Sequence, residues 1–572
     1  MSRPAFFALL LLGGAAGAAS AYDGVKVDSS GVRTAQAFVG DILLTRVAER
    51  MTSATGTNKL AVAYVLDPSL AGERYRVTVK DGRAEVRAGR TRALIFGTGA
   101  LLRRIAWADG AFAGADGMID ACPAKPFRMA YTARHFYNWY HMASTDELVR
   151  YIEDLSLWGI NGVHMQFAYP VVDLEYARPG DVERFERISH EFGAALARMD
   201  LDYIGYGGGN QAPFNTDPRL KAEPNVDPKR GNNGFNVCPA KPGGLEFLRR
   251  QQSAALARFK DVRSSWLEHW PFDEGGCACA ACSPWGGNGY LSLCAALAAD
   301  NAKACPGSKS LLSTWTFHDD EFARLYAYLA KPESDWIGAI LVDSHGDFPK
   351  YVLEHELPRK IPIVTFPEIS MWGREPWGGF GAVAMPSRFE RLFRQCEKVV
   401  SGFQFYSEGL AEDLNKVVVT QLYCDPSRSW QEIVRDYCRY EFPGVDPERF
   451  VTLVTHLENT QVLPNFDAKS NVMPNVGRGD VPHFDDFEAR CRYCLDEARK
   501  GEALSAELER SLSSGRRSSW RWRQIRLRTV IDREIFTARS WHTPTSDAAY
   551  RELVKIYNAD RTYGCIQPPI NR

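Results

Sequence analysis

The sequence lacks an excess of charge of either sign. Its 69 Lys and Arg residues balance 70 Asp and Glu residues, which leaves a formal net charge of −1 at pH 7. Nucleic-acid-binding proteins and proteins that adsorb to membrane surfaces usually carry a large positive patch or excess. We therefore expect neither a nucleic acid nor a membrane surface as a partner. The hydrophobic content of 45% is typical of a globular protein in water.

Beyond the N-terminus the sequence also lacks a long hydrophobic run, so we expect no membrane span. The N-terminus is typical of an export signal. Arg3 supplies positive charge, residues 6–12 are apolar, and Ala19–Ala21 fits a cleavage site for small residues. We expect residues 1–21 to be a signal peptide and the mature protein to be secreted or periplasmic.

A GxGxxG fingerprint is missing as well, which disfavours an open dinucleotide-binding sheet. Instead, strand-like and helix-like segments alternate eight times from Phe127 onward. Such alternation implies parallel strands, and eight rounds in about 290 residues fit a (β/α)8 TIM barrel. An open doubly wound sheet is the alternative. The predicted strands are Arg128–His135, Gly162–Phe167, Asp202–Tyr206, Ser265–Phe272, Leu311–Phe317, Ile337–Asp343, Ile361–Phe366 and Gly402–Tyr406.

Two further regions flank the predicted barrel, which we assign to residues 126–415. Residues 22–125 contain an amphipathic helix, a strand and a hairpin that turns at Asp81-Gly82, so we expect a small α/β domain there. Within it, the apolar periodicity of Thr91–Trp107 predicts one helix. Residues 416–572 predict a helical C-terminal domain.

Two adjacent carboxylates follow the fourth predicted strand. Asp273 and Glu274 repel each other at a position that offers few partners. Active sites of TIM barrels form at the C-terminal ends of the strands, so chemistry explains this pair better than stability does. Glu274 is the candidate general acid. The structural alternative is a salt bridge from Glu274 to a rim arginine such as Arg134.

Polar and aromatic side chains end the other predicted strands, where Val, Ile and Leu would fill an ordinary barrel. Asp343 and Glu368 end strands six and seven and are further candidate catalytic acids. Carboxylates perform acid–base chemistry, His and Asn bind hydroxyls, and Trp stacks on sugar rings, so the pattern is typical of a sugar-cleaving site. Hydrogen bonding within the rim and core packing are the structural alternatives. The candidate substrate-binding residues are His135, Asn210, Trp270, Trp315, His318, His345, Trp372 and Glu408.

Several motifs resemble exo-acting glycoside hydrolases of the β-N-acetylhexosaminidase and α-glucuronidase families. Asp273-Glu274 resembles the Asp-Glu dipeptide of hexosaminidases, although His269-Trp-Pro-Phe replaces their His-x-Gly-Gly. Tyr75–Val79 and Thr91–Leu102 are similar to the N-terminal domain of these enzymes, and Trp158–Val163 is similar to the second strand of α-glucuronidases. The loop that contains Cys277, Cys279 and Cys282 is similar to a poorly characterised group of glycosidases related to both families, as are Pro367–Met371 and Pro376–Gly381.

The resemblance implies a hydrolase that cleaves an oligosaccharide or polysaccharide containing amino sugars or uronic acids. In a hexosaminidase-like reaction, Asp273 would orient a substrate acetamide that attacks the anomeric carbon. In an inverting, α-glucuronidase-like reaction, Asp343 or Glu368 would activate water on the face opposite Glu274. A carbohydrate-binding protein on a degenerate barrel, without turnover, is the alternative outside enzymes. We expect no cofactor.

Three of the 13 cysteines lie close together, at Cys277, Cys279 and Cys282. Their spacing is compatible with a tetrahedral zinc site whose fourth ligand is Cys238, Cys294 or His269. A disulfide such as Cys277–Cys282 is compatible with export. In both cases we expect a structural role, in which the loop is held beside Glu274, rather than a catalytic metal.

Overall fold

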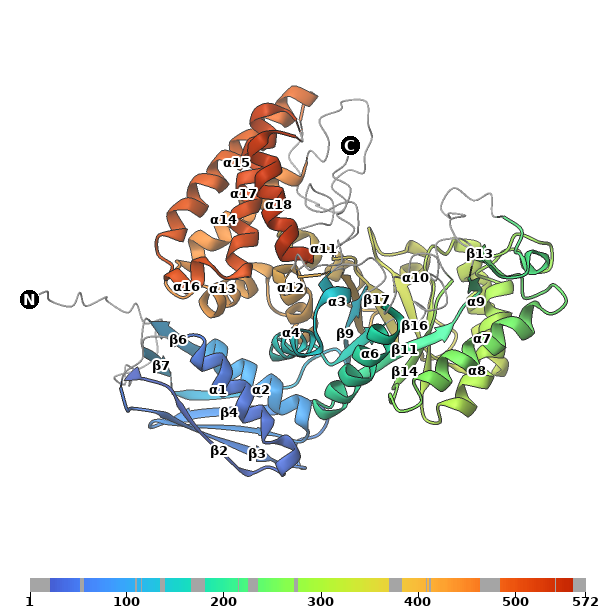
Figure 1. Ribbon diagram of the computed structural model, residues 1–572, viewed down its shortest axis with the longest axis horizontal. Helices are drawn as coiled ribbons and strands as arrows, with labels where there is room; N and C mark the ends of the chain where they lie inside the picture. The colour runs from blue at the N-terminus through green and yellow to red at the C-terminus, as the bar shows by residue number, and fades with distance from the viewer. Residues whose placement is uncertain are drawn as a thin grey trace, which may run out of the picture. The chain divides into compact units, whose positions relative to one another are not determined.

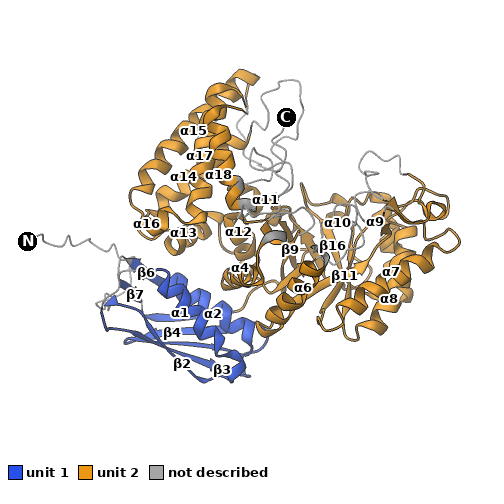
Figure 2. Cartoon of the chain, viewed as in Figure 1, with its two compact units in different colours: residues 1–121 blue, residues 122–572 orange. Residues whose placement is uncertain are grey.

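The structure is a computed structural model, and the chain divides into two compact units, residues 1–121 and 122–572 (Figure 2). The finer division near residue 415 stays a prediction, and the predicted signal peptide lies outside the described residues up to position 20. No described helix is both long and apolar enough to cross a bilayer. The described ranges are 21–51, 56–108, 111–114, 116–133, 139–165, 181–213, 215–224, 235–271, 276–369, 383–407, 409–410, 413–462, 484–540 and 542–558.

The first unit contains a five-stranded sheet with helices α1 (Phe38–Ala48) and α2 (Thr91–Arg104) on one face (Figure 1). The predicted hairpin is confirmed, because β4 and β5 pair across Asp81 and Gly82, both of which have positive φ. The sheet order is β2 (Val25–Gly31), β3 (Leu60–Leu66), β5 (Arg83–Ala88), β4 (Tyr75–Lys80) and β8 (Gly117–Ala121).

The helix predicted over Thr91–Trp107 is too long. Helix α2 ends at Arg104, and Ile105–Ala108 form strand β6, which pairs antiparallel with β7 (Ala111–Gly114). Ile105 already has extended backbone angles, with φ −73° and ψ 126°. Strand pairing with a neighbour therefore overrides the apolar helical spacing of this segment.

The second unit contains a closed barrel of eight parallel strands, which confirms the predicted TIM barrel. Each predicted strand is present, and the sixth has the predicted bounds. In barrel order the strands are β9 (Phe127–Thr132), β10 (Gly162–Met165), β11 (Asp202–Gly208), β14 (Trp266–His269), β15 (Lys309–Ser313), β16 (Ile337–Asp343), β17 (Ile363–Phe366) and β18 (Gly402–Ser407).

Helices connect the successive strands. Helix α4 shows why they form, since Ser144 accepts a hydrogen bond from the backbone N–H of Glu147 and Glu147 bonds back to Ser144, a capping box at its N-terminus. The described helices of this part are α3 (Trp139–Met142), α4 (Thr145–Leu157), α6 (Asp181–Arg198), α7 (Gly244–Arg258), α8 (Gly289–Ala304), α9 (Asp319–Leu329), α10 (Lys350–Glu354) and α11 (Pro386–Cys396).

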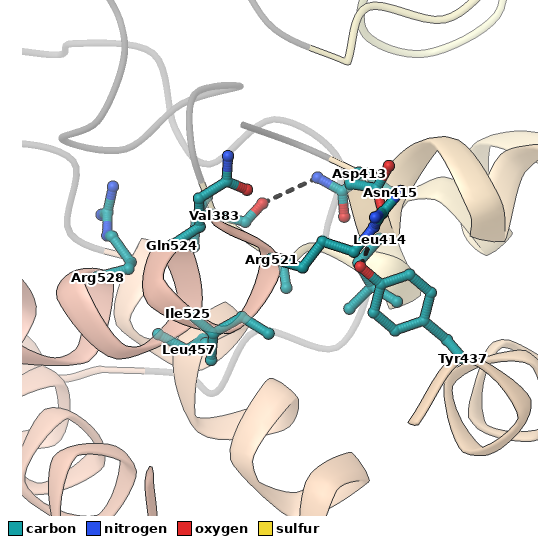
Figure 3. A pocket seen from close by; sticks show the side chains of 11 residues that line it. Val383, Asp413, Leu414, Asn415, Tyr437, Leu457, Arg521, Gln524, Ile525 and Arg528 are labelled. Carbon is teal, nitrogen blue, oxygen red and sulfur yellow. Dashed lines mark hydrogen bonds and ion pairs between the residues drawn. The ribbon is translucent and has the colours of Figure 1, made fainter. Parts of the chain in front are cut away.

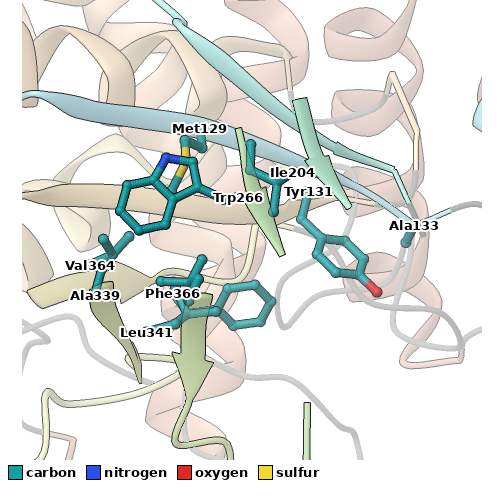
Figure 4. Close-up of a cluster of buried hydrophobic side chains, with 10 residues drawn as sticks. Met129, Tyr131, Ala133, Ile204, Trp266, Ala339, Leu341, Val364 and Phe366 are labelled. Carbon is teal, nitrogen blue, oxygen red and sulfur yellow. The ribbon is translucent and has the colours of Figure 1, made fainter. Parts of the chain in front are cut away.

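Side chains that alternate along the strands fill the barrel. Trp266, Leu341 and Phe366 belong to one buried apolar cluster inside it (Figure 4). Successive residues of a strand point to opposite faces, so residues two positions further along each strand share the inward direction. This register directs Trp270, Asp343 and Glu368 toward the mouth of the barrel at its C-terminal end.

The chain after the barrel is helical. Within it, Ser519 begins a new helix by accepting a hydrogen bond from the backbone N–H of Trp522. The helices are α12 (Asp413–Cys424), α13 (Trp430–Glu441), α14 (Pro447–Asn459), α15 (Phe487–Glu509), α16 (Ser514–Arg517), α17 (Trp520–Ala538) and α18 (Pro544–Asn558).

A buried ionic network joins these helices to the barrel. The carboxylate of Asp413 on α12 accepts hydrogen bonds from the hydroxyls of Tyr151 and Tyr437 at 2.9 and 2.8 Å, and from Nε of Arg521 at 2.7 Å. A cavity of about 30 Å³ lies beside this network (Figure 3). That volume holds about one water molecule, so the cavity is no sugar-binding site.

Candidate active site

The predicted catalytic dipeptide follows the fourth barrel strand. Strand β14 ends at His269, and the described chain continues to Pro271 and resumes at Gly276. Asp273 and Glu274 therefore lie outside the described residues, and only their place in the sequence, after β14, is known. Four other candidates also lie outside the described residues, namely Arg134, His135, Trp372 and Glu408.

Three of the predicted site residues come together at strands six and seven. Asp343 ends β16, and its Oδ1 accepts a hydrogen bond from the backbone N–H of His345 at 2.8 Å. Nδ1 of His345 in turn contacts Oε2 of Glu368, two residues beyond the end of β17. The Glu368 side chain is 2% exposed, whereas Asp343 is half-buried. The structure thus provides one buried carboxylate in contact with a histidine and one that is partly exposed.

The two predicted tryptophans that the structure describes lie against each other. The rings of Trp270 and Trp315 stack with centroids 5.7 Å apart and planes at 25°. Phe366 packs against both rings, and Trp315 meets the ring of His345 edge-on at 6.2 Å. Both tryptophans are partly exposed. An aromatic surface therefore adjoins the carboxylates of Asp343 and Glu368.

Two further candidates have local structural partners. Asn210 is 0% exposed, and its Nδ2 donates to the carbonyl of Val237 at 3.3 Å, so it holds the loop after β11. The backbone N–H of His318 donates to the Glu321 side chain at 3.0 Å at the start of α9. Neither contact brings these residues to Asp343 and Glu368.

A polar group that was not predicted from the sequence lies inside the barrel. Glu268 is 0% exposed, and its Oε2 is 2.6 Å from Nδ1 of His164 and 2.7 Å from Nε2 of Gln404, which donates to it. The ring of Tyr131 lies 4.3 Å from that of His164. Burial of a carboxylate is costly without such partners. The signal in the sequence was a single acidic residue within the apolar strand Trp266–His269, in inward register with Trp270.

His269 lies on the opposite face of β14. Its Nε2 is 3.3 Å from the hydroxyl of Ser310, and its carbonyl accepts a hydrogen bond from Tyr290 at 2.7 Å. Burial lowers the pKa of His269 from 6.5 to about 3, so its imidazole is neutral near pH 7. His269 does not belong to the group of described cysteine ligands.

We expect the buried His269 to make the fold sensitive to acid. Below pH 6.5 the imidazole of His269 binds a proton in the unfolded chain but not in the folded chain. The free energy of unfolding therefore keeps its full value above pH 6.5 and falls as the pH drops toward 3. At pH 5 this one group costs about 2 kcal/mol. His269→Gln should flatten the dependence of the urea midpoint on pH between 7 and about 5. His355→Gln, at an exposed histidine, is the control and should leave the dependence unchanged. Equal profiles for His269→Gln and the unmodified chain would contradict the assignment.

The structure also resolves the choice of partner for the cysteine loop. Cys238 lies beside Cys277, Cys279 and Cys282, and the four sulfur atoms all lie within 4.8 Å of one another. Neither Cys294 nor His269 belongs to this group of described residues. None of the cysteines that the structure describes forms a disulfide bond.

Comparison by sequence finds no matching family model and no matching curated protein. Comparison of structures finds a GH138 enzyme targeting pectin rhamnogalacturonan II, with a TM-score of 0.58 and 12% identity over 93% of this chain and 74% of that chain. A GH115 4-O-methyl-α-glucuronidase with specificity for decorated arabinogalactans has a TM-score of 0.59 and 10% identity over 97% and 80%. The fold is shared with known glycoside hydrolases.

A third neighbour extends this finding. The family 89 glycoside hydrolase from Clostridium perfringens, solved with GlcNAc-α-1,4-galactose, has a TM-score of 0.59 and 10% identity over 91% of this chain and 63% of that chain. The predicted resemblance to hexosaminidase-like and α-glucuronidase-like enzymes is therefore confirmed at the level of the fold. At identities near 10%, the arrangement of this chain's own side chains must carry the functional argument.

Proposed function

We propose that the protein is a glycoside hydrolase that cleaves glycans containing amino sugars or uronic acids. The observation that carries the proposal is the group formed by Asp343, His345 and Glu368 beside the stacked rings of Trp270 and Trp315. A stable barrel requires no acidic side chains at this rim. A sugar-cleaving site requires both carboxylates and a flat apolar surface.

Within this proposal Glu274 is the general acid that protonates the leaving oxygen. Asp343 is the better of the two candidate bases, because it is half-buried and open to a water molecule. Glu368 is buried and contacts His345, which suits a residue that positions the histidine. An acid and a base on opposite sides of the sugar give inversion, which requires carboxyl groups about 6.5–9.5 Å apart.

The site of action is part of the same proposal. Arg3, the apolar residues 6–12 and the small residues Ala19–Ala21 support export and cleavage after residue 21. We assign the mature protein to the periplasm or the medium, where polysaccharide fragments are available as substrates.

The proposal is tested by supplying the purified chain with aryl glycosides of uronic acids and N-acetylhexosamines, and with acidic polysaccharides. We expect turnover of an α-uronoside or an N-acetylhexosaminide, with inversion in the first product seen by NMR. Asp343→Asn should abolish turnover, and Asp273→Asn should have the smaller effect.

Other outcomes are equally clear. Retention, combined with a larger loss for Asp273→Asn, would replace the inverting mechanism by attack of the substrate's acetamide. Glycan binding without turnover of any substrate would overturn the hydrolase proposal in favour of a binding protein.

A further inference from the structure

Four cysteines from two separate loops meet outside the proposed active site. Cys238 follows strand β13 (Phe235–Asn236), whereas Cys277, Cys279 and Cys282 lie between β14 and α8. Sγ of Cys238 is 3.8 Å from Sγ of Cys279 and 3.8 Å from Sγ of Cys282. No more than 4.8 Å separates any two of the four sulfur atoms.

These separations match a tetrahedral metal site. Zinc–sulfur bonds measure about 2.3 Å, which places the corners of a regular tetrahedron about 3.8 Å apart. A disulfide requires about 2.05 Å between two sulfur atoms, and such bonds would divide the four into two close pairs. In this structure Cys238 is equally distant from Cys279 and Cys282, so the arrangement favours no pair.

The surroundings of the sulfur atoms also suit thiolate ligands. Cys238, Cys277 and Cys282 are each 0% exposed, and Cys279 is partly exposed. The backbone N–H of Glu223 points at Sγ of Cys277 at 3.4 Å, and the N–H of Ala278 donates to the carbonyl of Glu223 at 3.1 Å. A buried group of thiolates repels itself unless a cation neutralises it.

The backbone is shaped to bring the loops together. Gly276 has φ +71°, and a Cβ atom there would lie 1.9 Å from the ring of Trp285, so only glycine fits the entry to the loop. The N–H groups of Cys282 and Ser283 both donate to the carbonyl of Cys279 at 2.9 Å, which turns the chain so that its three thiols face one side. The backbone N–H of Cys238 donates to the carbonyl of Leu220 at 2.9 Å, which fixes the loop that carries Cys238.

We propose that Cys238, Cys277, Cys279 and Cys282 bind one structural zinc ion. A set of four thiolates leaves no open position for water or substrate, so the ion stabilises the fold and takes no part in catalysis. It joins the connection between β11 and α7 to the loop after β14. In the sequence, the proposed general acid Glu274 is three residues before Cys277.

The test is metal analysis of the full chain purified without chelator. We expect one equivalent of zinc per chain, and less than a tenth of that in Cys238→Ser and Cys279→Ser. Cys305→Ser, at a partly buried thiol outside the group, is the matched control and should keep its zinc. Reconstitution of the chelated chain with Co²⁺ should give the visible bands of tetrahedral cobalt bound to thiolates.

A measurement on the unmodified chain covers the case in which a variant does not fold. In the native protein, alkylation without reductant should leave these four cysteines unmodified until a chelator is added. A metal-free native chain whose intact mass is lower by two or four hydrogens would instead indicate disulfides and overturn the proposal. Zinc bound equally by Cys238→Ser and the unmodified chain would overturn it too. These readouts do not depend on any glycosidase activity.

Discussion

Replacement of Glu274 by glutamine is expected to lower kcat on an unactivated glycoside by about 10²- to 10⁴-fold, the usual contribution of a general acid. Glutamine keeps the size and polarity of the side chain but has no proton to donate to the leaving oxygen. Binding of the intact glycan should change little. The alkaline limb of the pH–rate profile, which reports loss of the acid's proton, should disappear.

A comparison of leaving groups separates this role from a structural one. The dinitrophenolate group of a dinitrophenyl glycoside leaves without protonation. Glu274→Gln should therefore slow cleavage of this substrate far less than cleavage of an unactivated glycoside. Glu356→Gln, at an exposed position after α10, is the control and should leave both rates unchanged. An equal loss on both substrates would show that Glu274 maintains the fold of the loop and is not the acid.

Replacement of Asp413 by alanine is expected to lower the stability of the second unit by about 3–5 kcal/mol. Asp413 is 3% exposed and accepts hydrogen bonds from Tyr151, Tyr437 and Arg521. Removal of the Asp413 carboxylate leaves the guanidinium of Arg521 buried with fewer counter-charges. The ion pair between Nη2 of Arg521 and Asp154, at 3.1 Å, remains. The melting temperature and the urea midpoint measure this loss.

An exposed ion pair supplies the control for Asp413. Glu507 pairs with Arg449, and both side chains are about half exposed to water. Solvent screens such a pair, so Glu507→Ala should cost about 1 kcal/mol or less. Asp413→Asn keeps an acceptor oxygen and should lie between the two. Similar midpoints for Asp413→Ala and Glu507→Ala would contradict the assignment of a buried network.

The barrel could be predicted from the sequence because its strands are short apolar runs separated by amphipathic helices. Strand β16 shows this, since Ile337–Asp343 is apolar up to its final acid and the polar Ser344 follows it. The sequence was insufficient where a distant partner determines the local structure. Ile105–Ala108 continue a helical pattern yet pair with β7 as a strand.

The candidate site could be predicted only in part for the same reason. Asp343 ends a strand and Trp270 and Glu368 follow strands by one and two residues, so the known location of barrel active sites was enough to select them. Glu268 lies within a strand, and its partners His164 and Gln404 are 104 and 136 residues away in the chain. The sequence likewise left three possible partners for the cysteine loop, and only the folded chain brings Cys238 to it.

The stacked indoles of Trp270 and Trp315 give the molecule an internal optical reporter. Two chromophores 5.7 Å apart share their electronic excitation, so they produce a paired circular-dichroism band whose sign follows their mutual orientation. A pyranose ring that binds to this surface would turn one indole relative to the other or change the polarity of the environment of the indoles. The arrival of a ligand can therefore be followed on the unlabelled protein, before any bond is broken.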